Sequence, residues 1–307
     1  MIREQKNATT TAELFNYGGQ AVIEGVMIRG QRSVATTVRR PNGELTTDIR
    51  PLSGIYSGRI RQTPFLRGVI VLIEAMVLGI KSLLYSANVS LEEEVEKISP
   101  GMVWLMMAVS LGLAVVLFLV APLLLTRLLD PYIDSPLIFN LIDGGIRVII
   151  FIGYLKLMTL MPDLRRVFAY HGAEHKVINA YEHGVPLEVS AVKKHSTAHT
   201  RCGTSFLFVV MIVAIITFTL VGRPTLWLMI LARIVLIPVI SAVSYEVVRF
   251  GAKHTRNILV RIIMAPGLWL QSLTTREPDD SQLEVAIASL QKVLESEQAE
   301  ETVQAPI

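Results

Sequence analysis

Four stretches of the chain are almost entirely apolar and long enough to cross a membrane. A helix needs about 20 apolar residues to traverse the hydrocarbon core of a bilayer. The chain meets this requirement at residues 102–126, 138–161, 204–221 and 225–247. The pattern therefore predicts a polytopic α-helical membrane protein with about four spanning helices.

Two further apolar segments are interrupted. Residues 64–87 have apolar positions at helical spacing, but three charged residues fall among them. We therefore predict that this helix is too polar to span and lies at the membrane interface or re-enters the membrane from one side. Residues 258–273 contain an arginine and a proline, which predicts a peripheral segment.

A small β-rich unit is predicted before the first span. Residues 33–40 and 45–49 alternate between apolar and polar positions, and Pro41, Asn42 and Gly43 separate them. An Asn-Gly pair between two alternating segments is a strong signal for a β-hairpin. The expected fold is therefore α+β overall, with a small β-containing cytoplasmic unit beside the membrane helices.

The C-terminal region is predicted to be helical and peripheral. Residues 279–295 have the pattern of an exposed amphipathic helix, with Ser281 and Glu284 as a capping box. The predicted organisation has seven parts: a disordered tail (1–16), the β-rich cytoplasmic unit (17–62), the interfacial helix with an acidic linker (64–100), a first transmembrane pair (101–161), a cytoplasmic loop rich in histidine (162–203), a second transmembrane pair (204–247), and C-terminal helices with a tail (248–307).

Basic residues are distributed unequally between the two sides of this arrangement. Twelve lie on the side of the termini, and Arg127 and Arg223 are almost alone on the other. The positive-inside rule then places both termini, the β-rich unit and the 162–203 loop in the cytoplasm. We therefore expect a multi-pass protein of the cell membrane, with the lipid bilayer as its partner and no nucleic-acid partner. The basic residues on the terminal side are Arg39, Arg40, Arg59, Arg61, Arg67, Arg165, Arg166, Lys193, Lys194, Arg249, Lys253 and Arg256.

Five of the six histidines fall in the 162–203 loop. Residues 164–182 have a helical pattern with a stop at His183-Gly184, so His171 and His175 share one helix face. Two imidazoles at this spacing can hold one cation, and the intervening Glu174 can activate a metal-bound water. The segment matches the short string H-x-x-E-H, but five residues alone do not establish proteolysis.

A second group of candidate ligands follows in the same loop. His195 and His199 are four residues apart, and Cys202 is three residues further on. Histidine nitrogen and cysteine sulfur suit zinc, with iron as the alternative. Additional candidates are Glu182, on the same predicted helix as His171 and His175, and Glu24 and Glu246 from other segments. Cys202 is also the sole cysteine, so no internal disulfide can form.

The non-metal interpretation of these residues remains open. A single His-x-x-x-His pair near a membrane more often caps a helix or contacts lipid headgroups than binds a metal. Two such pairs with a glutamate and a cysteine in one loop favour a metal site. Charged residues within the spans raise a similar choice between a polar cavity and a structural pair. For Arg147 and Arg233, with Asp143 as a possible partner, a structural pair or a snorkelling arginine is favoured.

Several strings resemble one family across nearly the whole chain. They are Gly18-Gly19-Gln20-Ala21-Val22-Ile23-Glu24-Gly25-Val26-Met27, Tyr170-His171-Gly172-Ala173-Glu174-His175-Lys176, Arg201-Cys202-Gly203-Thr204-Ser205-Phe206, and the stretch from Ala265 to Pro278. Together they are similar to the domain-of-unknown-function 1385 family, the YqhQ-like bacterial membrane proteins. The resemblance implies a metal-dependent enzyme without a known substrate. It points to His171, Glu174, His175, His199 and Cys202. Relatives commonly have His-Pro-Arg-Cys where this chain has Thr200 in place of the proline.

Two functional hypotheses follow. The first is a membrane-embedded metal-dependent hydrolase that acts at the cytoplasmic membrane surface, with a lipid-linked or membrane-protein substrate. The second is a non-catalytic scaffold, transporter or insertion accessory in which the same residues form a closed structural metal site or a histidine network. The substrate and the oligomeric state are not predicted.

Overall fold

The structure, a computed structural model, describes residues 17–54, 63–91, 99–254 and 257–304. It is mostly helical, with one four-stranded sheet. The strands are β1 (Gly18–Val22), β2 (Gly25–Arg29), β3 (Ser33–Arg39) and β4 (Leu45–Pro51). The helices are α2 (Leu66–Ser90), α3 (Pro100–Val115), η2 (Val116–Val120), α4 (Ala121–Arg127), η3 (Asp130–Tyr132), α5 (Pro136–Met158), α6 (Pro162–Glu182), α7 (Val189–Val192), α8 (Gly203–Val221), α9 (Leu226–Val235), α10 (Ile237–Lys253), α11 (Ile258–Thr274) and α12 (Asp280–Gln304). The predicted tail 1–16 and most of the acidic linker lie outside the described residues.

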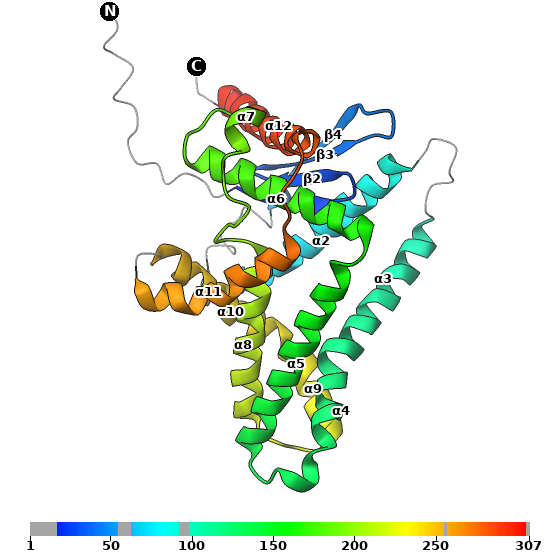
Figure 1. The fold of residues 1–307 in the computed structure, drawn as a ribbon, viewed down its shortest axis with the longest axis vertical. Helices are drawn as coiled ribbons and strands as arrows, with labels where there is room; N and C mark the ends of the chain where they lie inside the picture. The colour runs from blue at the N-terminus through cyan, green and yellow to red at the C-terminus, as the bar shows by residue number, and fades with distance from the viewer. Residues whose placement is uncertain (1–16, 55–62, 92–98, 255–256, 305–307) are drawn as a thin grey trace, which may run out of the picture.

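The molecule has two dissimilar ends (Figure 1). One end, here called the sheet end, consists of β1–β4 with α6, α7 and α12. A bundle of α3, α4, α5, α8 and α9 extends from it to the turn end, where residues 128–135 and 222–225 connect the helices. The α10–α11 pair lies beside the junction of the two parts.

The sheet is an antiparallel meander in the order β1-β2-β3-β4. The pairing of Arg39 with Leu45 closes the β3–β4 hairpin over the Asn42–Gly43 turn. The hairpin predicted from the Asn-Gly signal is therefore confirmed. A two-residue turn between Val22 and Gly25 joins β1 to β2.

Helices cover both faces of the sheet. Val26 and Ile28 on β2 point to one face, where they pack against α6 and α12. Met27 and Val34 point to the other face, where side chains of α2 such as Leu78 cover them. Alternation along the strands therefore gives two small apolar cores, because both faces are buried.

Helix α12 corrects the prediction of an exposed helix at the C-terminus. Its side chains Leu283 and Leu290 are fully buried against the sheet and α6. The predicted capping box is also displaced. Asp279 accepts a hydrogen bond from the Gln282 amide, and the Gln282 side chain accepts one from the Asp279 amide. The reciprocal pair thus lies two residues before the predicted Ser281–Glu284 pair.

Four helical segments are long and apolar enough to span a membrane: Leu66–Ser90, Gly101–Arg127, Pro136–Met158 and Gly203–Val221. The first of these corrects the prediction that residues 64–87 are too polar to span, since by length and composition α2 qualifies.

The predicted span 225–247 is not one straight helix. It consists of α9 and α10, which meet at a 48° bend and could form a fifth, broken span. Pro238 lies in the first turn of α10, where its ring cannot fit a continuous helix. The bend is therefore explained by Pro238, which lies within the apolar segment 225–247.

Ion pairs neutralise charged side chains of α2. Glu74 accepts a hydrogen bond from Arg29 of β2 at 2.9 Å, and Arg67 forms an ion pair with Glu246 of α10. The N-terminal half of α2 packs closely on α10 and its C-terminal half packs on the sheet. Two of the three charges that interrupt this helix therefore belong to its protein contacts.

Candidate metal centre

Helix α6 carries the first two candidate ligands. It ends at Glu182 with His183 as the C-cap and Gly184 at a positive φ of 67°, so the predicted stop is confirmed. Since His171 and His175 are one helical turn apart, their rings lie side by side with centroids 4.4 Å apart. The predicted pairing on one face is thus present.

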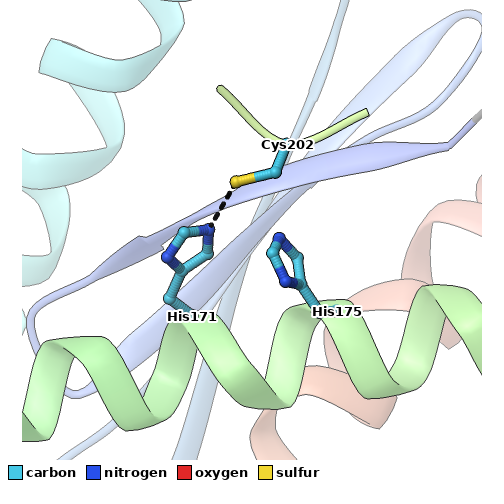
Figure 2. A group of neighbouring side chains, drawn as sticks. All are labelled: His171, His175 and Cys202. Atoms are coloured by element: carbon cyan, nitrogen blue, oxygen red, sulfur yellow. Dashed lines mark hydrogen bonds between the residues drawn. The ribbon is translucent and has the colours of Figure 1, made fainter. Parts of the chain in front are cut away.

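Cys202 joins this pair from the loop that leads into the bundle. It is the N-cap of α8, and its sulfur accepts a hydrogen bond from the Thr204 amide at 3.4 Å. The Sγ atom also lies 3.4 Å from Nε2 of His171 (Figure 2). One ligand atom from each of His171, His175 and Cys202 lies within 4.8 Å of the other two. These are the only residues in the described part of the chain that form such a group of three.

Backbone carbonyls fix the orientation of both imidazoles. Nδ1 of His171 lies 2.8 Å from the Thr274 carbonyl oxygen, and Nδ1 of His175 lies 2.5 Å from that of Thr197. A carbonyl can only accept, so each Nδ1 carries a proton, and in the neutral imidazole Nε2 then has a free lone pair. Metal-bound histidines in proteins have this same outer hydrogen bond.

The spacing of the group fits a tetrahedral metal. Zinc binds histidine nitrogen at about 2.0–2.1 Å and cysteine sulfur at about 2.3 Å, which sets the nitrogen–sulfur separation at about 3.6 Å. The observed 3.4 Å between His171 and Cys202 is close to that value. Without a metal, the Cys202 thiol would donate a hydrogen bond to Nε2 of His171. The three side chains can therefore serve as ligands without large rearrangement.

Glu174 lies beside this group on the same helix. It is buried, and one carboxylate oxygen is 3.5 Å from Nε2 of His175. The backbone of β1 closes over it at Gly19, where an added Cβ would lie 3.0 Å from Cγ of Glu174. A carboxylate at this position can act as a base toward a metal-bound water or bind the metal directly.

His199 is adjacent to the group but not part of it. Its ring centroid is 5.7 Å from that of His175, and its Nε2 is 3.5 Å from Glu182, which also pairs with Arg201. The buried amide of Gln271 holds the His199 backbone from both sides. Burial lowers the pKa of His199, and the nearby Glu174 carboxylate partly opposes that shift. His199 therefore lies in the outer layer of the site as a neutral imidazole.

Three candidate residues have other surroundings. His195 lies beside His183, with ring centroids 5.5 Å apart. Glu24 forms an ion pair with Arg166 and accepts a hydrogen bond from Tyr170. Glu246 of α10 forms an ion pair with Arg67 near the start of α2 and is not part of the three-ligand group.

Sequence reasoning missed the residues that support the ligands. The Thr197 and Thr274 carbonyls carry no side-chain signature, because any residue has a carbonyl. Gly172 is a second omission: a Cβ there would lie 2.0 Å from the Arg276 carbonyl oxygen. Only glycine lets the segment after α11 approach α6 closely enough for Thr274 to reach His171. The segment from Ala265 to Pro278, which resembles the family, contains Thr274, which supports His171, and Gln271, which supports His199.

Comparison with known proteins gives a family but no activity. The family model described as a protein of unknown function (DUF1385) matches residues 63–296. The chain is 37% identical over 306 residues to the uncharacterized protein YqhQ of Bacillus subtilis (strain 168), covering 94% of this chain and 96% of the relative. No solved structure matches the chain. The chain therefore belongs to the DUF1385 family of proteins of unknown function.

Proposed function

We propose that this protein is a membrane-embedded, metal-dependent hydrolase whose active site is the His171, His175 and Cys202 group. The observation that carries the proposal is the convergence of two imidazoles and a thiol, with both imidazoles held by carbonyls on their far side. Three protein ligands with an open fourth position are typical of catalytic zinc. Zinc is the expected metal, and iron is the alternative.

The residues divide the chemical work between them. His171, His175 and Cys202 would hold the metal, which supplies Lewis acidity to a water and to the substrate. Glu174 would accept the proton of that water, since its carboxylate lies 3.5 Å from Nε2 of His175. Because Glu174 is buried among protein groups, it is fixed in place before substrate binds.

A membrane location is supported by the exposed surface of the bundle. Large apolar side chains on its helices are far from buried, including Trp104 (70% exposed), Ile149 (69%) and Leu220 (84%). A bundle that exposes so much apolar surface is stable when lipid covers it. Basic side chains gather at the sheet end, which favours the cytoplasmic side for that end. The site then lies near the bilayer surface, where an amphiphilic, lipid-linked or membrane-protein substrate can reach it.

The packing of α2 supports an interfacial position although its composition permits a span. Gly68 near its start contacts Ala242 of α10, and Tyr85 near its end packs on the sheet. The end of α2 therefore lies on the sheet, and its start lies against α10 beside the junction of the sheet end and the bundle. With α2 at the interface, α3–α4, α5, α8 and the bent α9–α10 pair make four spans, and both termini lie in the cytoplasm.

A non-catalytic structural site is the second candidate. His199 lies next to His175, and a fourth protein ligand would close the coordination shell. A closed site would pin the loop before α8 to α6 and would leave no position for a substrate.

The Glu174→Gln variant separates the two candidates. It keeps the shape and burial of the side chain but removes the base, so the hydrolase should keep its metal and fail to complement a deletion strain. Glu182→Gln is the matched control, because this second glutamate of α6 contacts His199 and Arg201 and lies outside the three-ligand group. If Glu174→Gln complements fully while His171→Ala does not, the catalytic proposal is wrong and the structural one stands.

A further inference from the structure

A second cluster of charged side chains lies inside the helical bundle. Arg147 of α5 and Arg233 of α9 both approach the same oxygen of Asp143, with Nη2–Oδ2 distances of 2.9 and 2.8 Å. All three side chains are almost completely buried. The predicted pairing of these arginines with Asp143 is thus present, but one carboxylate serves two guanidinium groups.

The cluster has an excess positive charge. Two arginines and one aspartate leave one net positive charge in the interior, and neither arginine pairs with another acidic group in the part of the chain that the structure describes. Nε of Arg147 and both Nε and Nη1 of Arg233 are buried without a hydrogen-bond partner. An uncompensated charge and unpaired donors are both costly in a protein interior.

The surroundings of the cluster are aromatic and apolar, and the Phe218 ring only partly offsets its positive charge. The guanidinium carbons of Arg147 and Arg233 lie 5.1 and 5.2 Å from the centroid of the Phe218 ring. Phe218 also packs against Ile240 in the first turn of α10, which begins just after the bend. The bend brings the C-terminal end of α9, which has a partial negative charge and Arg233 in its last turn, next to the N-terminal end of α10, which has a partial positive charge. The two helix ends therefore offset each other, and the net charge of the cluster stays positive.

We propose that Arg147 and Arg233 form a binding site for a small monovalent anion within the bundle. One negative charge neutralises the cluster, and an anion can accept hydrogen bonds from the unpaired guanidinium donors. Water could serve these donors and the unpaired Oδ1 of Asp143, but it would leave the net charge uncompensated. The site is independent of the metal centre, because it shares no residue with it.

Chloride is the probe for the test. The melting temperature of the purified full chain in detergent is measured in chloride and in gluconate at equal ionic strength. Gluconate is the comparison anion because it is too large to enter a closed bundle interior. Chloride should raise the melting temperature by about 3 °C or more. Arg233→Gln should abolish this difference. Arg223→Gln is the matched control and should retain it, because Arg223 pairs with Asp130 in a more exposed position at the turn end.

Asp143→Asn provides a variant with the opposite expected effect. It raises the net charge of the cluster, so the chloride-dependent shift should grow, and the chloride-35 NMR line should broaden more than with the wild type. These two measurements keep the proposal testable if Arg233→Gln does not fold. An equal melting temperature in chloride and gluconate, or an unchanged shift in Asp143→Asn, would overturn the proposal and leave a cluster hydrated by water only.

Discussion

Two backbone carbonyls set the direction in which His171 and His175 present their metal-binding nitrogens. The spacing of the histidines was enough to predict that they share a helix face, because four residues make about one turn. Their approach to Cys202 was a hypothesis that spacing could not establish, since Cys202 lies 27 positions after His175 and most of the residues between them follow the end of α6. The carbonyls of Thr197 and Thr274 could not be predicted at all, because their role depends on tertiary packing.

Gly172 gives a prediction at the same scale. Gly172→Ala would place a methyl group against the Arg276 carbonyl oxygen and push the segment carrying Thr274 away from His171. We expect a loss of about 1–3 kcal/mol in the free energy of unfolding and a lower metal content. Denaturant unfolding and metal analysis measure the two effects.

Gly145→Ala is the control for that substitution. Gly145 also lies inside a helix, but nothing would lie within 4 Å of its added Cβ. This variant should keep its metal and its stability. If Gly172→Ala leaves both the free energy of unfolding and the metal content unchanged, the close approach of the segment after α11 is not needed to orient His171.

At the scale of elements, boundaries were easier to predict than burial. The Asn42–Gly43 turn and the stop of α6 after Glu182 have local chemical causes, so the sequence was sufficient for both. The burial of α12 depends on which surface its apolar face meets, and amphipathic spacing is the same for a membrane surface and for a sheet. The bend before α10 could have been predicted from Pro238, whose effect the hydrophobicity of the run concealed.

The buried face of α12 gives a second prediction. Leu290→Ala removes a fully buried side chain between α12 and the sheet and should cost about 2–5 kcal/mol in the free energy of unfolding. Lys292→Ala removes only an exposed pair with Glu295 and should cost about 0.5 kcal/mol or less. Chemical denaturation measures both, and equal small effects would contradict the packing of α12 on the sheet.

The position of α2 is testable by labelling introduced cysteines. If α2 lies at the interface, Phe65→Cys and Leu91→Cys should react with a membrane-impermeant maleimide from the same side. A spanning α2 would place them on opposite sides. The native chain is a suitable background because its single cysteine, Cys202, is buried.

At the scale of the whole molecule, the account predicts which end faces the outside. Tyr132 at the turn end is 85% exposed, and Asn42 lies exposed on the β3–β4 turn at the sheet end. In intact cells, Tyr132→Cys should react with the impermeant maleimide, whereas Asn42→Cys should react only after permeabilisation. The reverse pattern would invert the proposed orientation and place the candidate metal centre outside the cell.

The most direct test of the metal centre is X-ray absorption spectroscopy at the edge of the metal bound to the purified protein. We expect one metal per chain with one sulfur at about 2.3 Å and two imidazole nitrogens at about 2.0–2.1 Å for zinc. The sulfur signal should disappear in Cys202→Ser, the metal should be lost in His175→Ala, and His183→Ala should leave both unchanged. A protein that purifies without stoichiometric metal, or a metal surrounded only by oxygen, would contradict the account.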